Sequence, residues 1–322
     1  AGISGSAAAD TAAIGAVAIP AMIRQGYPPA FAAAVVAAGG AIGIIIPPSI
    51  PMVIFGFLTN VSIAKLFAGG LLVGTLFGLA LMAVTVVLSH HHGYGERRPF
   101  SLAFAVLSFR RAFWALWAPV IVLGGILTGV VTVTEAAALA VFYALLVSLA
   151  INRELVCHDL PDLIIRSQVA AAAILLIIAM AKVFTWLVGM QQTSQIVGTA
   201  MAGLDLPPWG LLLVVMAGLL LVGCVMETTA ALILLVPVLV ALTPQMAIDP
   251  IQFGIVVVTN LAIGMLTPPV GICLFVACGI SGVPLGRVAK AALPLVATTL
   301  AVLLLASYWP PLTLWLPRAL YP

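Results

Sequence analysis

The chain has 322 residues, of which 64% are hydrophobic and only 7% are charged. A water-soluble domain carries roughly 25% charged residues, so this composition excludes an ordinary soluble protein. The formal net charge of +3 is small and gives no indication of nucleic-acid binding. The apolar runs are continuous rather than alternating, which excludes a membrane β-barrel. We therefore expect an all-α, polytopic membrane protein.

The N-terminal stretch is rich in small and hydroxyl-bearing residues and contains Ser4, Ser6 and Asp10. It has no signal-peptide pattern. Because the chain starts abruptly inside this stretch, we expect it to be an N-terminally truncated piece of a longer protein. An apolar helix that ends near Pro20 is expected to follow.

Apolar runs of membrane-spanning length recur along the rest of the chain. A helix needs about 20 predominantly apolar residues to cross a bilayer. The sequence predicts spans or half-spans at residues 28–46, 66–88, 113–131, 135–151, 168–189, 209–225, 229–247, 251–266 and 287–307. Shorter apolar pieces are expected at 50–58 and 270–280, and residues 101–112 are predicted to form a separate interfacial helix.

Arginines gather in two connections between the predicted spans. Short connections rich in Lys and Arg stay in the cytoplasm. Two spans separate the two connections, so both fall on the same side of the membrane. The arginines are Arg97, Arg98, Arg110 and Arg111 in the first connection and Arg153 and Arg166 in the second.

A short word occurs twice, 221 positions apart. Residues 41–48 read Ala-Ile-Gly-Ile-Ile-Ile-Pro-Pro, and residues 262–269 read Ala-Ile-Gly-Met-Leu-Thr-Pro-Pro. Proline removes a backbone donor and clashes with the preceding helical turn, so each word predicts a broken helix. In lipid, such a break is tolerated only where protein or a water-filled cavity covers it. Paired breaks in the two halves of a membrane protein point to the binding site of a secondary transporter.

The neighbourhoods of the two words also match. Each half reads as a hydroxyl-rich turn, a helix ending near a proline (Pro20 or Pro237), a broken helix and a half-helix. We expect two structural repeats with re-entrant hairpins: repeat 1 at about 1–100, connecting helices at about 101–167, and repeat 2 at about 168–310. We expect the repeats to be inverted, although re-entrant hairpins look like spans and prevent a count that would establish it.

Oxygen-bearing groups accompany both breaks. Unwound carbonyls hold Na⁺ and the N-termini of half-helices face anionic groups in transporters of this kind, and hard cations prefer oxygen ligands. The candidate cation and substrate ligands are Ser4, Ser6, Asp10, Gly43 and Pro47 at the first break, and Glu227, Thr228, Thr229, Gly264 and Thr267 at the second. Na⁺ is expected at Ser4, Ser6 and Gly43, and at Thr228, Thr229, Gly264 and Thr267, with no other cofactor.

Three carboxylates lie in membrane-like context, where such residues are functional candidates by default. For Asp10 and Glu227 we favour a role in the site or in holding its hairpin. For Glu135 we favour helix capping, because a carboxylate in a first turn is favourable to the helix dipole. The cysteines match no metal motif.

An intramembrane protease is the rival class, since residues 2–5 (Gly-Ile-Ser-Gly) fit the nucleophile motif of rhomboid-like serine proteases. Such an enzyme needs a histidine base on a membrane helix. All four histidines lie in polar connections, at positions 90–92 and 158. The absence of an embedded base argues against an enzyme. A channel is a further alternative, but paired broken helices with hydroxyl-rich turns favour alternating access.

Four segments resemble the large membrane subunit of tripartite ATP-independent periplasmic (TRAP) transporters. Residues 2–15 are similar to the first hairpin tip of that family, and residues 46–53 to the stretch after its first break. Residues 132–138 are similar to its Thr-x-Thr-Glu-Ala-Ala run, and residues 260–271 to its second broken helix. Family members carry further membrane segments before the first tip, which strengthens the expectation of a truncated chain.

The resemblance implies a Na⁺-coupled elevator transporter in the bacterial inner membrane that imports an organic acid, such as a C4-dicarboxylate or a sialic acid. It implies a small membrane subunit and a periplasmic substrate-binding protein as partners. The alternative is an ion-coupled carboxylate transporter that works without a binding protein. The sequence does not name the substrate.

Overall fold

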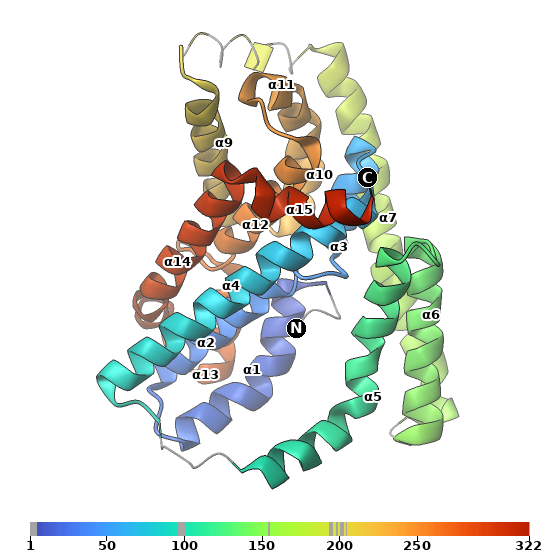
Figure 1. Cartoon of the computed structure of the whole chain (residues 1–322), viewed down its shortest axis with the longest axis vertical. Coiled ribbons are helices and arrows are strands. Elements are labelled where there is room, and N and C mark those ends of the chain that lie inside the picture. Colours follow the sequence, from blue (N-terminus) through green and yellow to red (C-terminus); the bar gives the residue numbers. More distant parts are fainter. Residues whose placement is uncertain are drawn as a thin grey trace. The chain divides into compact units, whose positions relative to one another are not determined.

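Every regular element among the described residues is a helix, as the sequence predicts (Figure 1). The computed structural model describes residues 5–95, 101–153, 155–192, 196–197, 199, 203 and 205–321. The chain divides into two compact units. The first combines Ala1–Glu96 with Thr185–Pro322, and the second is Arg97–Phe184.

The second unit is built on helix packing between α5 and α6. Its elements are α5 (Leu102–Leu127), α6 (Val133–Leu146), the π-helical turn η1 (Val147–Ile151), the 3₁₀ turn η2 (Cys157–Asp159) and most of α7 (Leu160–Met190). The Tyr143 hydroxyl donates to the Trp114 carbonyl at 2.8 Å and joins α6 to α5. At the start of α6, a Glu135 oxygen accepts from the Thr132 amide at 2.7 Å, and the Thr132 hydroxyl accepts from the Glu135 amide at 3.3 Å. This reciprocal capping box confirms the capping interpretation of Glu135.

The predicted separate interfacial helix at 101–112 is wrong. Residues 102–127 form one continuous helix, α5, which runs through the expected boundary. No glycine or proline occurs between Leu102 and Trp117, and the chain there consists largely of Ala, Leu, Phe and Arg. Without a residue that interrupts backbone hydrogen bonding, the first half of the helix, which ends in two arginines, continues directly into the second half.

The first unit contains the remaining helices. From the N-terminal part come α1 (Ala7–Arg24), α2 (Pro29–Ile42), α3 (Ile50–Thr59) and α4 (Ile63–His92). From the C-terminal part come α9 (Pro208–Gly223), α10 (Thr228–Leu239), η3 (Val240–Leu242), α11 (Thr243–Met246), α12 (Pro250–Gly264), α13 (Ile272–Ser281), α14 (Leu285–Tyr308) and α15 (Pro310–Leu320). The predicted breaks at the two repeated words separate α2 from α3 and α12 from α13.

Five helices are long and apolar enough to cross a membrane: Ala7–Arg24, Ile63–His92, Val133–Ile151, Leu160–Met180 and Leu285–Tyr308. Large apolar side chains on them face outward, for example Val17 at 73% and Val86 at 65% exposure. Exposure of this kind is unfavourable in water and favourable in lipid. The structure thus agrees with the predicted polytopic membrane protein.

Helix α12 forms the centre of the first unit. All its residues from Gln252 to Gly264 are buried, so it is surrounded by protein on every side. Such a helix must find partners for its polar groups. The Gln252 amide donates to the carbonyls of Ala306 and Ser307 at 3.0 and 2.9 Å, and the Asn260 amide donates to the Met216 carbonyl at 2.8 Å. These bonds tie α12 to α14 and α9.

The helices of the N-terminal and C-terminal parts interlock. Helix α1 packs on α13, and α10 packs on α3. Helices α4 and α14 run antiparallel: the end of α4 at Leu88 lies beside Lys290 near the start of α14, while Gly69 near the start of α4 abuts Thr313, just past the end of α14. Each half-helix, α3 or α13, therefore rests on a helix from the other part of the chain.

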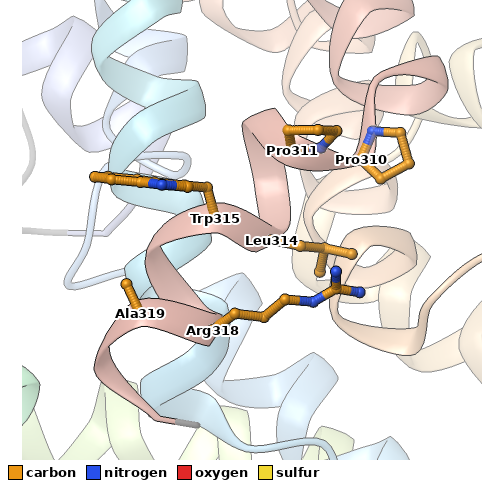
Figure 2. A pocket seen from close by; sticks show the side chains of 6 residues that line it. All are labelled: Pro310, Pro311, Leu314, Trp315, Arg318 and Ala319. Atoms are coloured by element: carbon orange, nitrogen blue, oxygen red, sulfur yellow. The ribbon is translucent and has the colours of Figure 1, made fainter.

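Helix α15 was not among the predicted elements. The sequence does not indicate a helix here, because the segment is short and contains three prolines. One face, with Thr313, Leu314 and Pro317, is buried against the first unit. The other face lines a shallow hollow with Trp315 and Arg318 (Figure 2). This hollow contains none of the predicted site residues.

Candidate functional site

The first break is the non-helical segment 43–49 between α2 and α3. Helix α2 ends at Gly43, whose amide donates to the Gly40 carbonyl at 3.0 Å. The peptide bond between Pro47 and Pro48 is cis. Neither proline has an amide donor, so helical hydrogen bonding stops here.

Ser49 starts the half-helix that follows the first break. Its hydroxyl donates to the Ile44 carbonyl at 2.5 Å and accepts from the Met52 amide at 3.3 Å. The second interaction is an N-cap, which satisfies one of the free donors at the start of α3. Ser49 therefore holds the two sides of the first break together.

The first tip, residues 5–6 before α1, lies directly against the first break. Gly5 has φ +64°, and a Cβ built on it would lie 2.9 Å from the Ile50 nitrogen and 3.2 Å from the Pro48 carbonyl oxygen. Only glycine fits this close approach in this conformation. Ser6 caps α1, with its hydroxyl 3.5 Å from the Ala9 amide. Ser6, which follows Gly5, thus lies in the tip beside the first break, while Ser4 lies outside the described residues.

Asp10 connects the first tip to the first break. It is only 6% exposed, and a Cβ added at Gly43 would collide with its carboxylate. One residue on, Thr11 is fully buried and lies against Gly40 in the same way. The two glycines of α2 therefore make room for two polar side chains of α1, one of them a carboxylate beside the break.

The second break is the segment 265–271 between α12 and α13. The Gly264 carbonyl accepts from the Thr267 amide at 2.9 Å, and the Met265 carbonyl accepts from the Cys273 amide at 3.1 Å. The bond between Pro268 and Pro269 is cis, as in the first break. The Thr267 hydroxyl donates to the Ile263 carbonyl at 2.9 Å, so its oxygen lone pairs remain available to accept.

The second tip, residues 224–227 between α9 and α10, closes on the second break through backbone. The Gly271 amide donates to the Cys224 carbonyl at 3.1 Å. A Cβ built at Gly264 would lie 2.6 Å from the Cα of Gly223. Helices α9 and α12 thus cross with backbone in contact, an approach that only small residues permit.

Glu227 and the two threonines after it have different roles. Glu227 caps α10: one oxygen accepts from the amides of Thr229 and Ala230 at 2.7 and 3.2 Å, and the other accepts from the Thr229 hydroxyl at 3.1 Å. The buried Thr228 instead donates to the sulfur of Met265, at the start of the second break, at 3.1 Å. Glu227 therefore holds the hairpin, while Thr228 touches the break.

Asp10 also lies near the second break. The Cys273 thiol, two residues past that break, interacts with the side chains of Thr11 and Asp10. Gly15, further along α1, packs against Ile280 of α13. Helix α1, which carries Asp10, thus packs both on α2, which leads into the first break, and on α13, which follows the second.

Two glycines of α4 support the first break and were missed by the sequence analysis. A Cβ at Gly70 would lie 3.0 Å from the Ile45 carbonyl oxygen, and one at Gly74 would lie 3.2 Å from the Ile46 nitrogen. Their spacing is the small-xxx-small pattern of packed membrane helices, so the signal was present in the sequence.

Two oxygen atoms of α12 were also missed. The hydroxyl of Thr259 and the side-chain carbonyl of Asn260 are buried and have no hydrogen-bond partner among the described residues. A buried polar atom of this kind calls for a water or an ion. Both lie just over one helical turn before Gly264.

The chemistry of this region is that of oxygen atoms and backbone dipoles. Among the described residues, no group of three or more His, Cys, Asp or Glu could hold a metal ion. The oxygen atoms beside the breaks are backbone carbonyls, the hydroxyls of Ser6 and Thr267, and the Asp10 carboxylate. This set suits a hard cation rather than a transition metal.

Comparisons with known proteins agree with this geometry. Residues 1–312 match the family model described as the DctM component of the tripartite ATP-independent periplasmic transporter. The chain is 44% identical over 311 residues to the isethionate TRAP transporter permease protein DctMQ of Oleidesulfovibrio alaskensis, covering 96% of this chain and 49% of the relative.

Two further relatives cover nearly all of this chain and 74% of their own length. The C4-dicarboxylate TRAP transporter large permease protein DctM of Pseudomonas aeruginosa is 39% identical over 318 residues, or 99% of the chain. The sialic acid TRAP transporter large permease protein SiaM of Vibrio cholerae is 35% identical over 317 residues, or 98% of the chain. The chain thus spans about half the length of the isethionate permease and about three quarters of the others.

Proposed function

Because the chain belongs to the DctM family of tripartite ATP-independent periplasmic transporters, we propose that it forms the substrate-translocating part of a permease that imports an organic acid. It is a multi-pass protein of the bacterial cytoplasmic membrane. The observation that carries the proposal is the pair of broken helices, each closed by a tip, with helix α1 and its Asp10 packed against both α2 and α13. Its relatives are transporter permeases rather than enzymes, and no catalytic residue is proposed.

Na⁺ is the proposed coupling ion. Broken helices leave carbonyl oxygens without helical partners, and such carbonyls coordinate Na⁺ in secondary transporters. The first proposed site uses Ser4, Ser6 and Gly43, with the charge of Asp10 nearby. The second uses Thr228, Thr229, Gly264 and Thr267.

The hydroxyl groups proposed for the second cation site do not all receive the same support from the hydrogen bonds. At the second site, Thr228 and Thr267 are the hydroxyls adjacent to the break. The hydroxyl of Thr229 is directed to Glu227, and it joins the proposed site only if that bond opens.

The proposed substrate is an anion that binds between the breaks. The half-helices α3 and α13 start at the breaks, and a helix N-terminus favours negative charge. The relatives carry isethionate, C4-dicarboxylates or sialic acid by their names, and all three are acids. An acidic group facing one or both half-helices is the recognition feature that these substrates share.

We further propose that the two parts of the first unit are inverted repeats that move as an elevator. Helices α4 and α14 occupy corresponding positions after the two half-helices and run antiparallel, which an inversion requires. In the two proposed repeats, α1 corresponds to α10 and α3 corresponds to α13. The packing of α1 on α13 and of α10 on α3 is therefore the pair of contacts expected from a two-fold relation. A transport unit tied together in this way can move as one body.

The proposed partners are a small membrane subunit and a periplasmic binding protein that delivers the substrate. One relative is named DctMQ and is about twice as long as this chain, in keeping with a large subunit joined to a second membrane component. The bilayer itself surrounds the apolar helices.

The test is uptake by the full-length permease, with its small subunit, in proteoliposomes under an inward Na⁺ gradient. Radiolabelled isethionate, succinate and sialic acid are supplied with and without the binding protein encoded beside the permease. We expect uptake of one of these acids that needs both Na⁺ and the binding protein. Uptake without any binding protein would favour the binding-protein-independent transporter, and uptake indifferent to Na⁺ would contradict the proposed cation sites.

A further inference from the structure

A pocket of about 300 Å³ with a mostly apolar lining and three polar side chains lies away from the two breaks, at the other end of α4. Its lining residues come from the start of α2, the end of α4 with the turn that follows, and the second and third turns of α14. Its polar lining consists of Lys290, His92 and Tyr94. We propose that this pocket binds the phosphate headgroup of an anionic phospholipid.

The pocket owes its shape to prolines and aromatic rings. Pro294 lies inside α14 and has no amide to donate to the Lys290 carbonyl, which loosens the helix at the pocket wall. Pro28, before the first turn of α2, forms the opposite wall. Helix α2 has no side-chain cap, so its first amides are not occupied by a side chain of its N-cap residue.

A row of neighbouring rings, some stacked and one pair tilted by 55°, carries the polar groups. The Tyr94 ring lies 5.3 Å from Phe31 and 5.1 Å from His92, measured between ring centroids. Tyr27 stacks on Phe31 from the other side at 6.3 Å. The row joins the α1–α2 turn to the end of α4, so Tyr94 and His92 are held in place rather than free to rotate.

The charge of the pocket fits a phosphate group. Lys290 supplies a full positive charge, and the Tyr94 hydroxyl is a donor. His92 has its Nδ1 3.0 Å from the Leu88 carbonyl, which makes Nδ1 the donor to that carbonyl. No acidic side chain lines the pocket among the residues described.

The surroundings of the pocket favour a lipid over a free phosphate ion. Leu88, Ala291 and Pro294 make one wall apolar. Next to them, Val87 and Leu293 are 64% and 60% exposed on the outer faces of α4 and α14. A headgroup in the pocket would thus continue into acyl chains on an apolar surface.

The position of the pocket along the chain also fits a binding site for an anionic lipid. The pocket lies just before Arg97 and Arg98, and the positive-inside rule places such a connection in the cytoplasm. Basic pockets between membrane helices on the cytoplasmic side bind anionic headgroups. The site would anchor the α2, α4 and α14 ends of the first unit to the inner leaflet.

The experiment measures phosphatidylglycerol binding to the full-length permease by native mass spectrometry, with phosphatidylcholine as the neutral reference. We expect phosphatidylglycerol to bind more tightly, and Lys290→Gln to weaken it about fivefold, the usual effect of one surface lysine. Lys290→Arg should retain binding, and Tyr94→Phe should weaken it without lowering the unfolding temperature. Arg287→Gln, one turn earlier on α14 and outside the pocket lining, is the matched control and should have little effect.

Three results would overturn the proposal. Equal losses for Lys290→Gln and Arg287→Gln would mean that surface charge, not the pocket, attracts the lipid. Equal binding of phosphatidylglycerol and phosphatidylcholine would show that the pocket does not recognise the negative charge of the headgroup. Complete displacement of the lipid by millimolar inorganic phosphate would assign the pocket to a free anion.

Discussion

The two breaks share a sequence word and a cis Pro–Pro bond but are closed in different ways. At the first break, the Asp10 carboxylate lies against Gly43. At the second, Gly223 and Gly264 bring two helix backbones into contact, and Glu227 turns away to cap α10. The repeated word therefore specifies a broken helix at both places. The neighbouring helices determine whether a carboxylate or a helix backbone lies against the break. We therefore expect the first break to respond to changes of charge and the second to changes of size.

The largest expected effect is that of Gly264→Ala. The added methyl group meets the backbone of Gly223 at 2.6 Å, and backbone cannot move aside as a side chain does. We expect a loss of about 3 kcal/mol of stability, at the upper end of overpacking, and no transport. The measurement is thermal unfolding of purified protein together with uptake.

The matched control for Gly264→Ala is Gly218→Ala in α9, where an added Cβ meets nothing within 4 Å. It should be neutral or slightly stabilising, because alanine is the better helix former. Equal behaviour of the two variants would mean that α9 and α12 do not cross as described.

Gly43→Ala should be milder, because it meets a side chain that can rotate away. We expect a folded protein in which Asp10 is displaced from the first break and transport is strongly reduced. Asp10→Asn should reduce transport while leaving the protein folded, since its shape is unchanged.

A double-mutant cycle tests the contact itself. In the Asp10→Ala/Gly43→Ala variant the collision is absent, so the stability lost in Gly43→Ala should be partly regained. Strict additivity of the two single changes would contradict contact between Asp10 and Gly43.

Thr267→Ala should raise the Na⁺ concentration for half-maximal uptake about fivefold, since one hydroxyl ligand contributes on the order of 1 kcal/mol. Thr267→Ser keeps the hydroxyl and should behave almost as the unmodified protein. The check is the Na⁺ dependence of initial uptake rates. An unchanged Na⁺ dependence would remove Thr267 from the second cation site.

The smallest of these effects is expected for Glu227→Ala. Loss of the cap on α10 should cost about 1 kcal/mol of stability and leave the Na⁺ dependence unaltered. Glu227→Asp should restore most of the stability, because aspartate is a good N-cap. A shift in Na⁺ dependence as large as that of Thr267→Ala would make Glu227 a member of the site instead.

The sequence predicted those features that depend on local chemistry. Apolar runs located the long helices, and the Gly and Pro-Pro words located both breaks, because these residues interrupt a helix wherever they stand. The capping role of Glu135 was likewise readable from the threonine three residues before it. The continuity of α5 was misjudged, since a pair of arginines does not end a helix.

Features that depend on packing between distant helices were not predictable from one sequence. The contact of Asp10 with Gly43 depends on α1, which packs on both α2 and α13, and no local pattern specifies that arrangement. The choice of Glu227 for the cap of α10 was one of two readings until its hydrogen bonds were seen. Helix α15 was missed because its prolines resemble those of a loop.

The most direct test of the account is binding of radioactive Na⁺ to the purified full-length permease in the absence of substrate. We expect saturable binding that Asp10→Asn weakens about tenfold, as expected on removal of a charged partner, and that Glu227→Ala leaves unchanged. Equal Na⁺ affinity in Asp10→Asn and the unmodified protein would contradict the assignment of charge to the first break.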